Sequence, residues 1–140
     1  MNRRTHEYAL LVEDDPGVRE GLAEIMRSEG YPVVTCPDAK IAMDLLISGA
    51  DLPCVIFLDF MMPNMDGWSF LDERKKRSWL RDIPVVGMSA SQKLVERSEP
   101  PAGVDDLLKK PFKVESILRA IEKYFPGRSI EAPRNLGAGG

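Results

Sequence analysis

The chain alternates between short apolar runs and longer segments in which apolar residues recur at helical spacing. An apolar run without polar alternation is typical of a strand that is covered on both faces of a sheet. Such runs predict five strands, at Tyr8–Val12, Pro32–Cys36, Val55–Asp59, Ile83–Met88 and Asp106–Lys109. Each run stops at polar, charged or turn-forming residues, which mark the end of the strand.

Capping residues and periodic apolar positions predict five helices. Asp15 and Asp38 are suited to cap the first two, and Pro16 suits the first position of a helix. The predicted helices run from Pro16 to Gly30, from Asp38 to Ser48, from Trp68 to Arg77, from Gln92 to Arg97 and from about Lys113 to Phe125. Because each connection between strands carries a helix, the sheet should be parallel and the fold α/β.

The length of 140 residues suits one domain with a full core. The segment 126–140 is rich in Pro and Gly with few apolar anchors, so we interpret it as a flexible tail or linker. No apolar run is long enough to span a membrane, and the first residues lack a signal-peptide core, which makes a cytoplasmic location the expectation. Cys36 and Cys54 lack metal-ligand spacing, and His6 is the only histidine, so zinc and histidine chemistry are poorly supported.

The net charge of −3 gives no general attraction to nucleic acid or to an anionic membrane. A local exception is the run of cations from Arg74 to Arg77. Such a run could suit an anionic partner, but we interpret it as the solvated end of the third predicted helix, where cations suit the helix dipole.

Three carboxylates should meet at one edge of the sheet. Glu13 and Asp14 follow the first predicted strand, and Asp59 ends the third. Ionised together, they would repel one another unless a cation intervenes, and the candidates are Lys110 and a bound Mg²⁺, which prefers oxygen ligands. With the hydroxyl of Ser89 at a further strand end, these groups make phosphoryl transfer to Asp59 plausible. The alternative is that Asp59 only caps the turn that follows it.

Four ordered motifs closely resemble the receiver domain of two-component response regulators. They are Leu11–Asp15, Leu58–Gly67, Met88–Ala90 and Lys109–Phe112, and the resemblance covers about residues 7–125. It implies a receiver domain over 7–125 with a flavodoxin-like, doubly wound sheet in the strand order 2-1-3-4-5. Five helices accompany that sheet, and the fourth should be short or irregular because Pro100 and Pro101 interrupt it.

The resemblance also implies a role for each site residue. Asp59 would accept a phosphoryl group from a histidine kinase or a histidine phosphotransfer protein. Glu13, Asp14 and Asp59, with the backbone carbonyl of Met61, would hold Mg²⁺. Ser89 would be the switch hydroxyl, and Lys110 would pair with the phosphoryl group and precede a cis proline. Asp66 and Gly67 match a turn after the acceptor, in which we interpret Asp66 as structural.

Three departures from the family pattern concern its output. Leu107 stands where the family usually has an aromatic residue, so rotation of a ring cannot be the readout. Pro100 and Pro101 fall within the family's fourth helix, at the expected output face. Met61 cannot orient an attacking water, which predicts slow self-dephosphorylation, although Ser91 could partly compensate.

The expected protein is therefore a signalling domain and not an enzyme in its own right, beyond its own phosphorylation and dephosphorylation. Its expected partners are the kinase or phosphotransfer protein and a downstream protein target, without nucleic acid or membrane, and it should be a monomer or weak dimer. Two alternatives stay open. One is a receiver-like adaptor that is never phosphorylated, and the other is a phosphohydrolase with an aspartyl-phosphate intermediate. The second is disfavoured because Met61 replaces the second aspartate of such enzymes.

Overall fold

The computed structural model describes residues 7–62, 65–90 and 102–125 of the chain. The predicted helix from Gln92 to Arg97 and the two prolines at 100 and 101 lie outside these ranges, as does the segment 126–140.

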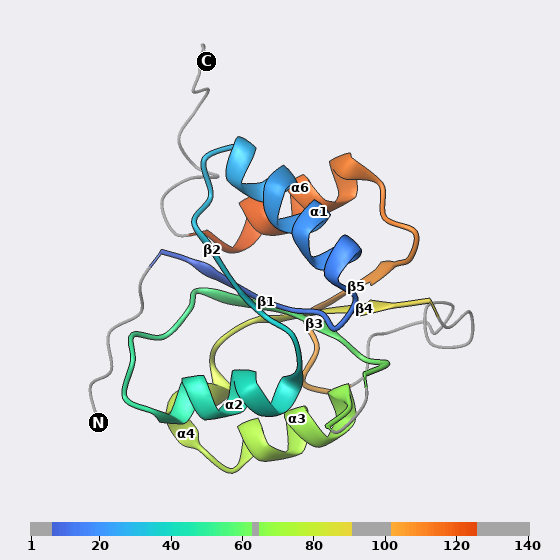
Figure 1. Cartoon of the computed structure of the whole chain (residues 1–140). Coiled ribbons are helices and arrows are strands. Elements are labelled where there is room, and N and C mark those ends of the chain that lie inside the picture. Colours follow the sequence, from blue (N-terminus) through green and yellow to red (C-terminus); the bar gives the residue numbers. More distant parts are fainter. Residues whose placement is uncertain (1–6, 63–64, 91–101, 126–140) are drawn as a thin grey trace.

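One five-stranded parallel sheet forms the middle layer of the fold (Figure 1), in the order β2-β1-β3-β4-β5. The strands are β1 (Ala9–Val12), β2 (Val33–Cys36), β3 (Val55–Asp59), β4 (Val85–Ser89) and β5 (Asp106–Lys109). Both the parallel sheet and the strand order that the resemblance implied are confirmed. The predicted strands differ from the observed ones by no more than two residues at either end.

Helices cover both faces of the sheet, with α1 and α6 on one face and α2, α3 and α4 on the other (Figure 1). Their bounds are α1 (Pro16–Ser28), α2 (Ala39–Ile47), α3 (Gly67–Lys75), α4 (Ser78–Arg81) and α6 (Val114–Tyr124). The predicted caps of the first two helices are confirmed. Asp15 accepts a hydrogen bond from the backbone N–H of Val18, and Asp38 accepts one from Ile41.

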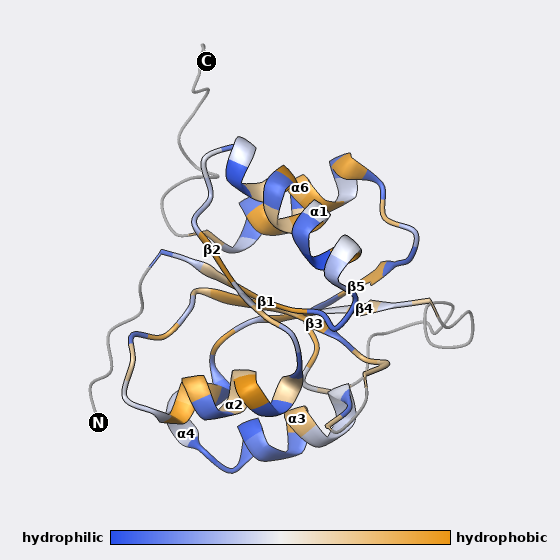
Figure 2. Ribbon diagram, viewed as in Figure 1, coloured by the Kyte–Doolittle hydropathy of each residue, from blue (hydrophilic) through white to orange (hydrophobic). Residues whose placement is uncertain are grey.

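The sheet divides the core into two apolar layers, and the helices turn their hydrophobic sides towards it (Figure 2). Alternate residues of each central strand enter opposite layers, so Leu10 and Ile56 pack beneath α2 while Leu11 and Phe57 pack beneath α1 and α6. All residues of β1, β3 and β4 are buried. Burying a large apolar side chain contributes about 1.5–3 kcal/mol, so these strands fix the position of the sheet's carboxyl edge.

The region after α3 differs from the prediction. Instead of continuing to Arg77, α3 ends at Lys75, and the short helix α4, which the sequence pattern did not predict, follows it. Trp79 of α4 is packed against the apolar layer beneath α2 and α3. Among the described residues, no helix is long and apolar enough to cross a membrane.

The interpretation of the cationic run as a solvated helix end is wrong for its first member. Arg74 is only 7% exposed, and its guanidinium donates hydrogen bonds to the backbone carbonyls of Arg81 (2.7 Å) and Ile83 (2.6 Å). Burial lowers the pKa of this guanidinium from its usual value, and Asp105 and Asp82 act in the opposite direction. Arg74 thus ties α3 to the segment that leads from α4 into β4.

We expect Arg74→Ala to lower the free energy of unfolding by about 2–4 kcal/mol. Hydrogen bonds to a charged group contribute about 1.5–3 kcal/mol each, and the substitution would remove the donor from the backbone carbonyls of Arg81 and Ile83. Lys75→Ala, at the exposed neighbouring position, should change it by less than about 0.5 kcal/mol. Urea unfolding of both variants measures the difference. Equal effects would show that Arg74 is no more than a surface cation.

Candidate functional site

The acidic residues that the sequence places at strand ends do meet at the carboxyl edge of the sheet. Val12 of β1 lies beside Leu58 of β3 in the parallel register, so Glu13 leaves the sheet next to Asp59. Carboxylate oxygens of Glu13, Asp14 and Asp59 all lie within 4.8 Å of one another. Glu13 and Asp59 are fully buried, at 0% and 1% exposure, and Asp14 is partly exposed.

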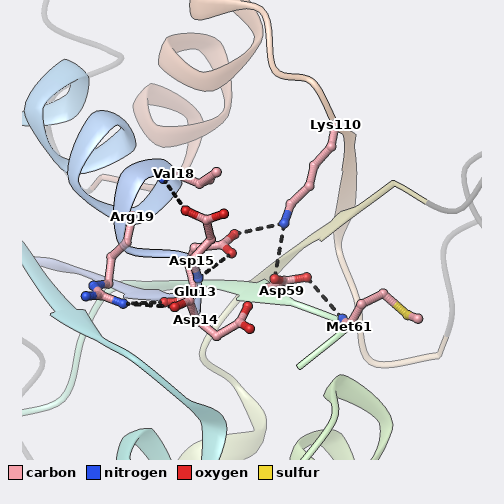
Figure 3. A network of polar contacts seen from close by, with 8 residues as sticks. All are labelled: Glu13, Asp14, Asp15, Val18, Arg19, Asp59, Met61 and Lys110. Carbon is pink, nitrogen blue, oxygen red and sulfur yellow. Dashed lines mark hydrogen bonds and ion pairs between the residues drawn. The ribbon is translucent and has the colours of Figure 1, made fainter. Parts of the chain in front are cut away.

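Lys110 supplies the cation of this cluster. Its Nζ lies 3.0 Å from Oε1 of Glu13 and 3.1 Å from Oδ2 of Asp59 (Figure 3). The lysine directly follows β5, and its backbone N–H donates to the carbonyl of Ser89 at the end of β4. The Lys110–Pro111 peptide bond is cis, as the resemblance implied. The ammonium therefore reaches into the cluster from a neighbouring strand end.

The loop after β3 holds the other oxygen of Asp59. The backbone N–H of Met61 donates to Oδ1 of Asp59 at 3.0 Å, so the turn-capping contact considered for Asp59 exists beside its contact with Lys110. The side chain of Met61 is 67% exposed, and it extends away from the carboxylates (Figure 3). Both oxygens of Asp59 are thus engaged by donors.

Ser89 occupies the strand end expected of it. It is the last residue of β4 and is fully buried. In the register, Asp59 lies beside Met88, and Ser89 lies beside Lys109. Ser89 is therefore one residue further along β4 than Met88, the neighbour of Asp59. Lys110 is in turn one residue further along the chain than Lys109, the neighbour of Ser89 on β5.

Burial dominates the electrostatics of Glu13. Burial, and to a lesser extent Asp59, raise the pKa of the Glu13 carboxyl, while Lys110 and the N–H of Asp15 lower it, and the net result is a rise from 4.5 to about 7. Burial by itself would lower the pKa of Lys110, but its contacts with Glu13 and Asp59 outweigh that effect, and the net shift is upward. Glu13 and Lys110 thus each hold a proton more tightly than usual.

The donor set fits a hard divalent cation. Three carboxylates converge, although only one ammonium faces them among the described residues. Oε1 of Glu13 is buried and, within the described part of the chain, has no hydrogen bond of ordinary geometry, although Lys110 lies at ion-pair distance. All-oxygen ligands with room for further groups are typical of Mg²⁺ sites.

Asp66 and Gly67 lie at the start of α3, after the candidate acceptor. Asp66 caps α3 by accepting a hydrogen bond from the N–H of Ser69, so the interpretation of Asp66 as structural is confirmed. A Cβ at Gly67 would lie 2.7 Å from the ring of Phe60, a distance that real Cβ atoms essentially never show. This close approach explains why the turn carries glycine.

One residue of the site was missed from the sequence. Arg19, in the first part of α1, donates from one guanidinium nitrogen to the backbone carbonyls of Glu13 (3.0 Å) and Asp14 (3.4 Å). The only sequence signal for it is a cation one helical turn after the cap Asp15, and many surface arginines share that position. Its role depends on how the chain bends before the helix, which periodicity does not report.

Comparisons with known proteins show which sequences and folds this chain is similar to. The family model described as "Response regulator receiver domain" matches residues 9–122. The chain is 39% identical over 110 residues to the response regulator MprA of Mycolicibacterium vanbaalenii, covering 78% of this chain and 46% of that protein. It is 30% identical over 132 residues to the probable transcriptional regulator ycf27 of Galdieria sulphuraria, covering 89% of this chain and 50% of that protein. It spans about half the length of these curated relatives.

Solved structures show the same fold. The receiver domain of the sensor histidine kinase PA1611 from Pseudomonas aeruginosa, described with a magnesium ion coordinated in its active site cleft, has a TM-score of 0.72 at 27% identity. The match covers 88% of this chain and 98% of that one. The chemotaxis response regulator CheY4 of Vibrio cholerae has a TM-score of 0.73 at 23% identity, covering 89% of this chain and all of that one.

The raised pKa of Glu13 predicts a pH dependence of stability in the absence of metal. The folded state favours neutral Glu13, so this contribution is complete below about pH 4.5 and is lost as the pH rises through about 7. At 1.4 kcal/mol per pKa unit the loss reaches about 3 kcal/mol. We expect Glu13→Gln to remove it, so that in EDTA the variant gains stability relative to the wild type between pH 5 and 8.

Urea unfolding at several pH values measures this difference. Glu20→Gln, at an exposed position of α1, is the matched control and should follow the wild-type pH profile. A Glu13→Gln profile parallel to that of the wild type would contradict the assignment of a buried carboxyl that binds its proton tightly.

Proposed function

Because the chain belongs to the response regulator receiver domain family of two-component systems, we propose that Asp59 accepts a phosphoryl group from a histidine kinase or a histidine phosphotransfer protein. The observation that carries the proposal is the position of Asp59. It ends a buried central strand, next to two further carboxylates, with Lys110 3.1 Å from one of its oxygens. A carboxylate held in this way is placed to act as a nucleophile.

In the proposed reaction, a carboxylate oxygen of Asp59 attacks the phosphorus of a phosphohistidine. The new O–P bond forms as the P–N bond breaks, and the imidazole leaves with the electron pair of that bond. Phosphoryl transfer requires positioning and neutralisation of charge on the equatorial oxygens. Lys110 supplies one positive charge at the acceptor, and the N–H of Met61 orients the Asp59 carboxylate.

Glu13, Asp14 and Asp59, with the backbone carbonyl of Met61, are the residues that we propose hold Mg²⁺. The bound ion would neutralise negative charge on the phosphoryl oxygens. The support comes from the convergence of three carboxylates, the buried Oε1 of Glu13 and the description of magnesium in the related receiver of PA1611. Asp14 is the most exposed of the three carboxylate residues.

We further propose that Ser89 and Lys110 follow the charge added at Asp59, which amounts to about −1.5 to −2. The two residues are coupled, since the Lys110 N–H is hydrogen-bonded to the Ser89 carbonyl. Leu107 lies against Gly87, where a Cβ would come within 2.9 Å of the Leu107 side chain. The response therefore passes through packing of β4 against β5 and not through rotation of an aromatic ring.

The proposed output is protein contact. We assign the receiver to residues 7–125 and a tail or linker to 126–140, and we propose a downstream protein target with the receiver acting as a monomer or weak dimer. Nucleic acid is not proposed as a ligand, because the net charge of −3 offers no attraction to phosphate backbones. A location in the cytoplasm, where histidine kinases present their phosphorylated domains, completes the proposal.

Incubation with a small phosphodonor and Mg²⁺ should add one phosphoryl group, visible by intact-mass analysis. We expect no adduct on Asp59→Asn or in EDTA. Asp66→Asn is the matched control, because asparagine retains the capping of α3 and the acceptor is untouched, so its adduct should form normally. A wild-type chain without an adduct would favour the phosphorylation-independent adaptor, and an adduct that survives Asp59→Asn would place the acceptor elsewhere.

The adduct should also be long-lived, because the Met61 side chain has no group that could orient a water for attack on the acyl phosphate and is directed away from Asp59. We expect Met61→Asn, which keeps the backbone carbonyl, to shorten the lifetime severalfold. The decay of the adduct over time measures this. An unchanged lifetime would mean that another group controls hydrolysis.

A further inference from the structure

We propose that Arg19 is a positioning residue that holds Glu13 and Asp14 in the bent conformation needed to bind a divalent cation, an inference that rests on the proposed metal site. In this proposal Arg19 is not itself a ligand of the metal ion. It acts through the backbone to which those carboxylates are attached.

Two successive residues, Glu13 and Asp14, contribute their side chains to the same site. In a strand, successive side chains point to opposite faces and successive carbonyls to opposite sides. Glu13 and Asp14 instead bring their carboxylates within 4.8 Å of each other and of Asp59. The backbone must therefore leave strand geometry between Val12 and the cap Asp15.

Arg19 is the side chain that stabilises this bend. Its guanidinium nitrogen lies 3.0 Å from the carbonyl oxygen of Glu13 and 3.4 Å from that of Asp14, so two successive carbonyls turn to the same donor (Figure 3). These carbonyls lie beyond the end of β1, where the strand ladder no longer satisfies them. The Arg19 side chain is only 17% exposed, and its Nε lies 3.9 Å from Glu20.

The remaining contacts of the bend involve other groups. The N–H of Glu13 donates to the carbonyl of Cys36 on β2, and the N–H of Asp15 donates to Oε2 of Glu13. In the described part of the chain, the Asp14 carbonyl accepts its hydrogen bond from Arg19. Asp14 is also the least buried of the three carboxylate residues, so its position depends most on this arginine.

Charge and position predict opposite effects of removing Arg19. A guanidinium near the site repels a divalent cation, so loss of its charge alone would strengthen Mg²⁺ binding. Loss of the bend would weaken it, because residues that orient metal ligands typically contribute 10–100-fold to metal affinity. The sign of the change therefore separates the two roles.

The experiment is a titration of the full chain with Mg²⁺ alone, at fixed pH and ionic strength. Tryptophan fluorescence is the readout, since the Trp68 ring packs edge-to-face on Phe60, the residue after Asp59, with ring centres 4.9 Å apart. We expect Arg19→Gln to raise the Kd for Mg²⁺ about tenfold. Arg19→Lys should recover part of the affinity, because an ammonium supplies donors without the planar fork of arginine.

Arg27→Gln is the matched control. Arg27 also lies in α1 and also donates to a backbone carbonyl, that of Val33 at 2.8 Å, but it lies in the last turn of the helix while the site adjoins the first. Its loss should leave the Kd within about twofold of the wild type. A similar weakening in both variants would overturn the proposal, because it would reflect general loosening of α1.

An unchanged or lower Kd for Arg19→Gln would also overturn the positioning role. If Arg19→Gln does not fold, as judged by circular dichroism, Arg19→Lys decides, and a wild-type Kd would then overturn it. A wild-type chain that shows no response to Mg²⁺, or a response unaffected by Asp14→Asn, would instead overturn the proposed metal site itself. These outcomes separate failure of the inference from failure of the proposed function.

Discussion

The repulsion between three carboxylates at one edge of the sheet is the constraint on which the rest of the site depends. Glu13, Asp14 and Asp59 are brought together by the register of β1 against β3, and that register is fixed by strands that are completely buried. The apolar core therefore stabilises an arrangement that electrostatics opposes. Lys110 offsets part of the repulsion, and burial together with the nearby Asp59 still raises the pKa of Glu13. A bound cation is the natural way to relieve the rest.

The sequence was informative wherever a local pattern determined the structure. Apolar runs located the strands, and helix caps such as Asp15 and Asp38 located two helix starts. Parallel strands share a carboxyl edge, so the sequence alone predicts that Glu13, Asp14 and Asp59 converge. The strand order came from the resemblance to a family, since periodicity alone does not distinguish the possible orders of a doubly wound sheet.

The features missed from the sequence all depend on contacts between segments. Arg74 looked like one of four solvated cations, and only the return of the chain through α4 buries it against the carbonyls of Arg81 and Ile83. Arg19 was not singled out from the sequence, yet it reaches back to the segment before its helix. Both arginines satisfy backbone carbonyls where a strand or helix has ended, and a sequence pattern does not show which carbonyls lack partners.

The same contacts suggest how a change at Asp59 could affect distant parts of the domain without the rotation of an aromatic ring. Lys110 pairs with Asp59 through its side chain and with Ser89 through its backbone. A displacement of the lysine would therefore also displace the end of β4. β4 has little freedom to absorb it, because Gly87 is enclosed by Leu107, Phe60 and Val104 and leaves no room even for a Cβ. Under the proposed switch, movement would then pass to β5, which is tied to α6 by the contacts of Asp106 with Lys123 and Tyr124. In the proposed mechanism, Leu107 would act through its packing against Gly87, and the strand pair with α6 would carry the change towards the surface.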